Sequence, residues 1–244
     1  MTEKPSPEAS TVFETSWEVC NKVGGIYSVL SSKSSYMQDT YEEYYAIGPY
    51  QEDEAQDHFD EIQPPSKYEG IVETLADEGI TLHFGTWRVN NEPNCILVEY
   101  DGLWDNLNEY KKSLWEQYSV DTLHSGGDVH NPLLLSKAVS RFVEESMSQN
   151  CVSADDTIVH CHEWLTGFTA LFLDNHDART AFTTHATTLG RSMSGSGYDL
   201  YDVLDDVDPA EEAQKLGVED KHSVERAAAH NADVFTTVSK ITGR

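Results

Sequence analysis

The chain has 244 residues, of which 43 are acidic and 16 are Lys or Arg, so its formal net charge is −27. A surface this acidic repels nucleic acid and anionic membranes, which excludes both as partners. No stretch of about 18 apolar residues occurs, and the polar first ten residues lack the apolar core of a signal peptide. We therefore expect a cytoplasmic protein in which residues 1–10 form a disordered leader.

The acidic residues are spread along the chain between apolar segments instead of gathering in one tail. This distribution favours a folded protein from a salt-loving organism, because concentrated salt screens the repulsion between like charges. The four cysteines have no Cys-x-x-Cys spacing, which in a cytosolic chain predicts buried free thiols at Cys20, Cys95, Cys151 and Cys161.

The first half of the chain predicts a mixture of strands and helices. Strands are expected at residues 11–15, 44–47, 81–84 and 95–100, and helices at 71–77, 103–118 and 132–148. The segment 51–67 is acidic and contains prolines, which predicts a surface excursion. Three tryptophans of this half are expected to pack in the core or between subdomains: Trp87, Trp104 and Trp115.

The second half alternates more regularly between the two kinds of element. Strands are expected at residues 157–161, 181–184 and 234–238, and helices at 164–175, 210–216 and 223–231. Strands that alternate with helices predict an α/β domain with a mostly parallel sheet flanked by helices.

Two segments place polar residues where predicted strands end: His160–Gly167 and Phe182–Arg191. In an open parallel sheet, ligands bind at the carboxyl ends of the strands. Histidines, a carboxylate, a tryptophan and an arginine would then face one crevice. That set suits a sugar, which has hydroxyls to hydrogen-bond, together with an anionic leaving group. Strand alternation places Cys161 on the sheet face opposite His160 and His162, so neither a metal site nor a nucleophilic cysteine is expected there.

A glycine-containing loop follows the first predicted strand and precedes a helical stretch. It consists of Lys22, Val23, Gly24 and Gly25. Glycines let backbone amides approach a phosphate closely, and both the helix amino terminus and the lysine favour its negative charge. A Gly-Gly turn between a strand and a helix is also common without any such role, so the motif alone leaves both interpretations open.

Five blocks of sequence, taken together and in order, resemble the glycogen synthases of the animal and fungal type (glycosyltransferase family 3). They are Phe13–Ser28, His160–Trp164, Phe182–Arg191, Glu225–His230 and Asp233–Ser239. The resemblance spans nearly the whole chain, but only the amino-terminal half of such an enzyme. It implies the GT-B architecture, in which two Rossmann-like domains enclose the active site. Residues 11–244 would be the first domain, with the carboxy-terminal nucleotide-binding domain absent.

The resemblance also implies a reaction. It is glucosyl transfer from a nucleotide-glucose, either UDP-glucose or ADP-glucose, to the 4-hydroxyl end of an α-1,4-glucan, with retained configuration and with no metal or other cofactor. The nucleotide is gripped mainly by the second domain of such enzymes. The chain alone is therefore expected to be incomplete and inactive, and a separately encoded carboxy-terminal domain is a candidate partner.

The same resemblance assigns roles to individual residues. It implies that His185 contacts the transferred glucose and that Arg191 holds the donor phosphate, so these two are expected to be catalytic. The residues that bind the donor phosphate are expected to be Lys22, Val23, Gly24, Gly25 and Arg191. The residues on the sugar or acceptor side are expected to be His162, Glu163, Trp164 and His185.

Ordinary structural roles would explain these residues without the resemblance. His185 would be a strand-end histidine satisfied by neighbouring threonines, Arg191 a surface ion pair, and Trp164 a core residue. His160 and Glu225 are expected to be structural in either case.

At the level of the whole protein, the alternative is a non-catalytic glucan-binding or regulatory module derived from such an enzyme. Retention of phosphate-side residues such as Lys22 and Arg191 favours the enzyme, because a binding module need not keep them. A sucrose- or trehalose-forming GT-B transferase is a weaker alternative, and the Phe182–Arg191 block speaks against it.

Overall fold

A computed structural model describes residues 7–239 of the chain. Most of the predicted leader, residues 1–6, lies outside the described residues. Ser10 is already hydrogen-bonded on both sides, because its backbone N–H donates to the Asp156 carbonyl and its carbonyl accepts from Glu43 N–H, both at 3.1 Å. The ordered structure therefore begins at or before Ser10.

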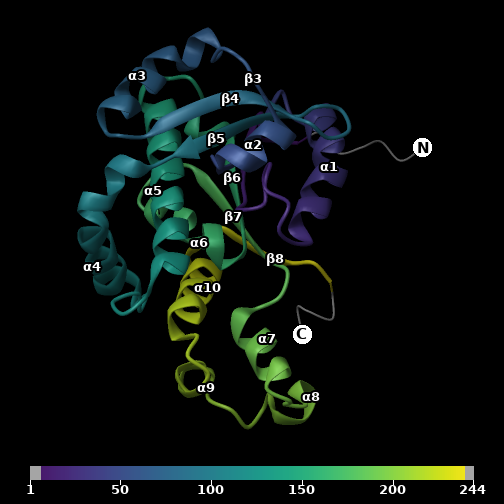
Figure 1. The fold of residues 1–244 in the computed structure, drawn as a ribbon, viewed down its shortest axis with the longest axis vertical. Coiled ribbons are helices and arrows are strands. Elements are labelled where there is room, and N and C mark those ends of the chain that lie inside the picture. The colour runs from purple at the N-terminus through teal and green to yellow at the C-terminus, as the bar shows by residue number, and fades with distance from the viewer. Residues whose placement is uncertain (1–6, 240–244) are drawn as a thin grey trace.

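The centre of the fold is an eight-stranded sheet in the order β3-β4-β5-β2-β1-β6-β7-β8 (Figure 1). The strands are β1 (Thr11–Thr15), β2 (Glu43–Pro49), β3 (Phe59–Glu61), β4 (Thr81–Trp87), β5 (Asn94–Glu99), β6 (Thr157–His162), β7 (Arg179–Thr184) and β8 (Val234–Thr237). The six neighbouring strands β5, β2, β1, β6, β7 and β8 pair in parallel. At the other edge of the sheet, β4 pairs antiparallel with β5, and β3 pairs antiparallel with β4. The predicted α/β class with a mostly parallel sheet is confirmed.

Helices cover both faces of this sheet (Figure 1). One face is covered by α1 (Ile26–Thr40) and α2 (Glu52–His58). The other is covered by α3 (Glu69–Asp77), α4 (Leu107–Tyr118), α5 (Gly127–Ser148), α6 (Glu163–Leu173) and α10 (Glu219–Asn231). Strand alternation explains the two cores, since Val12 packs with the first group of helices and its neighbour Phe13 with the second.

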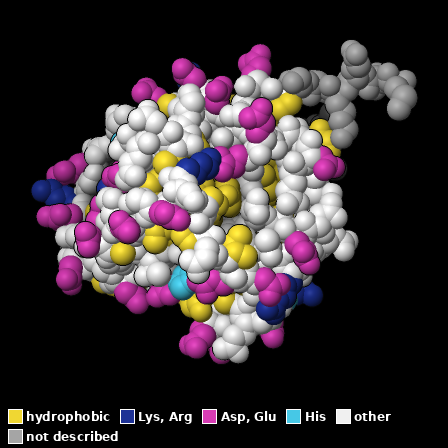
Figure 2. Space-filling model, turned by 90° about the horizontal axis from the view of Figure 1, so that it is seen from above, with side chains coloured by type: hydrophobic (Ala, Val, Ile, Leu, Met, Phe, Trp, Pro, Cys, Tyr) yellow, Lys and Arg dark blue, Asp and Glu magenta, His cyan; other side chains and the backbone are white. Residues whose placement is uncertain are grey.

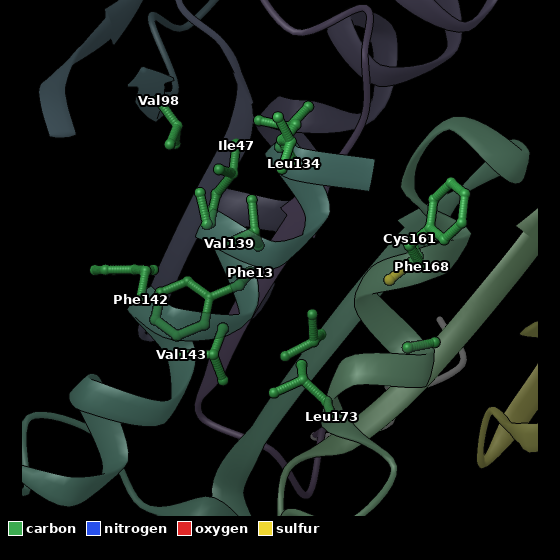
Figure 3. Close-up of a cluster of buried hydrophobic side chains, with 14 of the residues drawn as sticks. Phe13, Ile47, Val98, Leu134, Val139, Phe142, Val143, Cys161, Phe168 and Leu173 are labelled. Carbon is green, nitrogen blue, oxygen red and sulfur yellow. The ribbon is translucent and has the colours of Figure 1, made fainter. Parts of the chain in front are cut away.

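The larger core lies between the sheet and α5 (Figure 3). The Phe13 and Phe142 rings meet edge to face with their centroids 5.1 Å apart, a favourable geometry for aromatic pairs. Cys161 points into this core, on the face opposite His160 and His162, as the alternation predicted. Cys20, Cys95 and Cys161 are buried free thiols, but Cys151 is only partly buried, so that prediction was wrong for one cysteine of the four.

A small lobe lies below the sheet in Figure 1, and in the chain it comes between β7 and α10. It is made of α7 (Thr188–Gly195), α8 (Leu200–Val203) and α9 (Pro209–Lys215). Its own apolar cluster is centred on Leu189, Met193 and Ala213. The first two of these helices were not predicted: α7 is only eight residues long and rich in serine and glycine, which are weak helix formers, and α8 is a single turn of four residues.

Three other predictions need correction. The segment 51–67 is not a simple surface excursion, because it contains α2 and β3, which bury Ala55 and Phe59. Acidic residues in the first turn of α2 interact favourably with the positive end of the helix dipole, so they support a helix instead of a loop.

The helix predicted from residue 132 begins at Gly127. Trp104 and Trp115 are 40% and 45% exposed, so of the three tryptophans only Trp87 is a core residue.

The surface is acidic on the face seen in Figure 2, where Asp and Glu side chains are scattered widely and Lys and Arg are few. None of the helices in residues 7–239 is long and apolar enough to cross a membrane.

We expect the folded state to depend on salt. Lowering KCl from molar to millimolar concentration removes the screening of a net charge of −27, and the helical circular dichroism signal is expected to fall. An unchanged spectrum across this range would contradict the idea that the acidic surface is adapted to high salt.

Candidate functional site

The polar residues that follow β1, β6 and β7 lie where the order of the strands in the sheet reverses. From β1 the chain passes through α1 to β2 on one side, whereas β6 lies on the other side of β1 and continues through α6 on the opposite face. Such a switch point opens a crevice at the carboxyl ends of the strands, and ligands of open α/β sheets bind there. The loops after β1, β6 and β7 all emerge at this edge.

A buried carboxylate, Glu14, lies in the middle of this region and was not predicted. It sits on β1 opposite His160 of β6, on the α1 face of the sheet. Its Oε1 accepts a hydrogen bond from His162 Nε2 at 2.7 Å and lies 3.2 Å from His160 Nδ1. The Lys33 ammonium of α1 contacts the same oxygen. Its Oε2 accepts from the Tyr44 hydroxyl at 2.7 Å.

These contacts fix the charges of the cluster. Burial alone would raise the pKa of the Glu14 carboxyl, but hydrogen bonds from His160 and His162 and the charge of Lys33 hold the pKa well below its usual range. Burial lowers the pKa of His162 to about 4, against the opposing effect of Glu14. Near neutral pH the cluster therefore holds an ionised glutamate, a charged lysine and a neutral His162.

The same cluster carries the atoms of a potential metal site. The ligand atoms of Glu14, His160 and His162 lie within 4.8 Å of one another. The Lys33 ammonium, however, already contacts the glutamate oxygen that both histidines share. The lysine thus supplies the positive charge that a metal ion would bring, and we assign no metal to these residues.

His185 follows β7 and is half-buried next to His162. Its Nε2 lies 3.1 Å from His162 Nδ1. Burial, followed by the charge of Lys33, lowers the pKa of His185, so its imidazole is neutral at pH 7. The predicted alternative, a histidine satisfied by neighbouring threonines, describes His160 instead, whose Nε2 lies 2.7 Å from Thr183 Oγ1.

Glu163 begins α6 with a left-handed backbone, at φ 61°. Its buried Oε1 accepts from the backbone N–H of His185 at 2.7 Å and of Ala186 at 3.1 Å. The carboxylate therefore holds the chain just after β7 in place. Burial raises the pKa of Glu163, and the nearby Glu18 carboxylate of the β1 loop adds to the rise.

Trp164 packs partly against the larger core. The Lys221 ammonium of α10 lies 5.3 Å from the centre of its ring, a distance typical of a cation–π contact. One face of the indole is thus already in contact with a cation. Stacking of Trp164 on a sugar stays a prediction.

Arg191 lies on α7 and is largely free. Its side chain is 62% exposed, and its Nη2 lies 3.7 Å from Glu163 Oε1, a long ion pair in water. The start of α7 is held by Glu225, whose carboxylate accepts from the Thr188 backbone N–H at 2.9 Å and from its hydroxyl at 3.0 Å. The helix is anchored, while the guanidinium remains available to a ligand.

Glu225 gives a pH dependence that can be tested. Burial raises its pKa to about 7, against the hydrogen bonds from Thr188. A carboxyl whose pKa is raised in the folded protein stabilises the fold below its unfolded pKa, and this contribution is lost as the pH rises through the folded pKa. Between about pH 4.5 and pH 7, wild type is therefore expected to lose up to about 3 kcal/mol relative to Glu225→Gln.

Urea unfolding of both proteins at several pH values in this window, in molar KCl, measures the difference. Because both chains share every other titrating group, the comparison isolates Glu225. Parallel stability curves for the two proteins would contradict the raised pKa.

The loop of Lys22, Val23, Gly24 and Gly25 is exposed and leads into α1, with Gly25 as the residue that caps the helix. Its geometry explains one glycine: a Cβ on Gly24 would lie 2.5 Å from Glu18 Oε1. Glu18 itself accepts from the Tyr27 backbone N–H at 2.8 Å in the first turn of α1. A carboxylate therefore already occupies part of this helix amino terminus, which makes the cation Lys22 more important for attracting an anion.

The structure brings four of the nine predicted site residues into one set of contacts: His162, Glu163, His185 and Arg191. Glu18 lies next to Gly24 of the glycine loop, and its charge acts on Glu163. Sequence reasoning missed Glu14, Glu18 and Lys33. For Glu14, the available signal was the position of an acidic residue inside the predicted strand 11–15.

Comparison with known proteins gives a consistent result. The chain matches the profile of the glycogen synthase family over residues 14–244. It is 35% identical over 244 residues to glycogen [starch] synthase isoform 2 of Saccharomyces cerevisiae, covering 95% of this chain and 34% of that protein. It is 34% identical over 236 residues to the liver glycogen [starch] synthase of Mus musculus, covering 95% of this chain and 33% of that protein.

Among solved structures, the chain aligns with the catalytic domain of starch synthase IV from Arabidopsis thaliana bound to ADP and acarbose. The TM-score is 0.42 at 15% identity, and the alignment covers 95% of this chain and 51% of that one. The chain spans about a third of the length of the curated relatives described above. Since the family profile covers almost all of its residues, the chain belongs to the glycogen synthase family.

Proposed function

We propose that the chain is the amino-terminal, Rossmann-like domain of a GT-B glucosyltransferase of the glycogen synthase type. The proposed reaction moves glucose from a nucleotide-glucose to the 4-hydroxyl end of an α-1,4-glucan with retention of configuration. One observation carries the proposal. In a member of this family, Glu163 binds the backbone of His185 and contacts the Arg191 guanidinium, next to the carboxyl ends of the parallel strands.

On the phosphate side, the proposal uses the exposed cations of the site. Arg191 offers a planar fork that suits two phosphate oxygens, and Lys22 adds a mobile charge next to the backbone of Val23, Gly24 and Gly25. As the bond to the sugar breaks, negative charge grows on the departing nucleotide. A guanidinium already in place stabilises that charge, which lowers the barrier. The proposal requires no metal or other cofactor.

On the sugar side, His185 is proposed to contact the transferred glucose through hydrogen bonds. Two neighbours hold it: His162 contacts its ring, and Glu163 binds its backbone N–H. His162 and Glu163 are therefore proposed to act mainly by positioning His185. Trp164 is proposed to lie at the edge of the sugar or acceptor path.

A second domain is needed to complete this site. We propose that it binds the nucleotide base and closes over the donor, which excludes water during transfer. Whether it follows on the same polypeptide or is encoded separately does not alter the proposed chemistry. The proposed donor is either UDP-glucose or ADP-glucose, because the base that distinguishes them is proposed to bind the second domain.

The test is glucosyl transfer to glycogen from labelled UDP-glucose and ADP-glucose in molar KCl. The chain is assayed alone and together with a carboxy-terminal domain of the same enzyme. We expect transfer only when both domains are present, and the faster donor identifies the nucleotide. Transfer by the chain alone would contradict the need for a second domain. Glycogen binding without transfer in either case would favour a non-catalytic module.

A further inference from the structure

Three buried or half-buried side chains form a hydrogen-bonded series that ends at the ligand side of the site. Glu14 Oε1 lies 2.7 Å from His162 Nε2, and His162 Nδ1 lies 3.1 Å from His185 Nε2. Both contacts are within hydrogen-bonding range for ring nitrogens. His162 is therefore bound through both of its nitrogens, and His185 through one.

The direction of each hydrogen bond follows from its neighbours. An ionised carboxylate accepts only, so the proton of the first bond belongs to His162 Nε2. A neutral imidazole carries one ring proton, which leaves His162 Nδ1 as an acceptor. The second bond must then be donated by His185 Nε2. In the neutral ring of His185, the remaining nitrogen Nδ1 carries no proton.

The surroundings of Glu14 support its role as the fixed end of the series. Oε1 also contacts the Lys33 ammonium and His160 Nδ1, and Oε2 accepts a hydrogen bond from the Tyr44 hydroxyl. Each of these groups faces the carboxylate as a donor. These contacts keep the glutamate ionised against the effect of its burial, whereas burial keeps both His162 and His185 neutral. Within residues 7–239, no side chain or backbone group hydrogen-bonds to His185 Nδ1.

We propose that Glu14 is a positioning residue which, through His162, holds the ring proton of His185 on Nε2 and presents Nδ1 as a hydrogen-bond acceptor to a ligand hydroxyl. The identity of that ligand as a sugar rests on the proposed function, but the proton arrangement does not. An acceptor at this position favours a group that can donate, such as a sugar hydroxyl. It disfavours a ligand that offers only an acceptor there.

The arrangement can be read directly by NMR of the 244-residue chain labelled with ¹⁵N in its histidine rings, in molar KCl. We expect a slowly exchanging proton on His185 Nε2 that shows a scalar coupling across the hydrogen bond to His162 Nδ1. His185 Nδ1 and His162 Nδ1 are expected to carry no proton. A proton on His162 Nδ1 or on His185 Nδ1 would overturn the proposal.

A double variant tests whether Glu14 sets the arrangement. Glu14→Leu combined with Lys33→Leu removes the carboxylate together with its charged partner, so no unpaired buried charge remains. We expect the coupling between His162 and His185 to be lost, because His162 no longer has an obligate acceptor. Retention of the coupling with the same polarity would overturn the role of Glu14.

A matched control lies in the same polar cluster. Thr183→Val removes the hydroxyl next to His160 Nε2, and this hydroxyl takes no part in the hydrogen bonds that join Glu14, His162 and His185. The coupling is expected to persist in this variant, and its loss would show that general loosening of the cluster, not the carboxylate, controls the proton. None of these measurements needs substrate or a second domain, so failure of the glucosyl-transfer assay leaves their outcome intact.

Discussion

Replacing Arg191 by alanine is expected to lower kcat for glucosyl transfer about 100- to 1,000-fold when the second domain is present. The Arg191 side chain is 62% exposed, and its only ion pair within residues 7–239 is a long contact to Glu163, so it is not needed for folding. Its removal takes away the charge that would stabilise the departing nucleotide. Steady-state kinetics with the preferred donor measure the effect.

The first residue of β7 offers a matched control. Arg179 has a side chain that is 62% exposed, like that of Arg191, and it has a 3.9 Å contact to Asp233. Arg179→Ala is expected to leave kcat unchanged within about twofold, since it lies at the amino end of the strand, away from the proposed site. Arg191→Lys is expected to recover only part of the rate, because an ammonium lacks the planar fork. Equal effects of the two alanine variants would contradict the role of Arg191.

Replacing Glu14 by alanine is expected to lower the free energy of unfolding by about 3–5 kcal/mol. The carboxylate is fully buried, and its loss leaves the Lys33 ammonium, two histidines and the Tyr44 hydroxyl without their shared partner. Uncompensated buried polar groups are among the few causes of such a large loss. Urea unfolding in molar KCl measures it.

An exposed pair provides the comparison for that experiment. Asp60 accepts from Arg88 Nη2 at 2.6 Å, but both side chains are largely in water. Asp60→Ala is expected to cost much less than Glu14→Ala, because water screens an exposed ion pair. A loss of similar size for Glu14→Ala would mean that the buried network contributes little to stability.

Much of the second half of the fold could be predicted from the sequence. Residues 157–184 and 219–237 place short apolar strands next to helices with clear periodicity, and the structure has β6, α6, β7, α10 and β8 there. The polar residues after β6 and β7 also meet, because parallel neighbours bring their carboxyl ends together. Local pattern was sufficient in these cases.

The interior of the site could not be predicted in the same way. Glu14 reads in the sequence as one acid among 43 acidic residues, and only the pairing of β1 with β6 places it opposite His160. The contact of Glu163 with backbone amides depends on a left-handed turn that no local pattern specifies. Register and side-chain direction are tertiary properties, and they decide which predicted residues bind a ligand and which hold a neighbour.

We propose that the donor phosphate and glucose bind at the carboxyl ends of β1, β6 and β7. A crystal structure of the chain joined with its second domain, grown with UDP-glucose or ADP-glucose, would show whether they do. We predict the diphosphate between Arg191 and the loop of residues 22–25, with the glucose next to His185. A donor bound elsewhere, with Arg191 and this loop free of phosphate, would contradict the account.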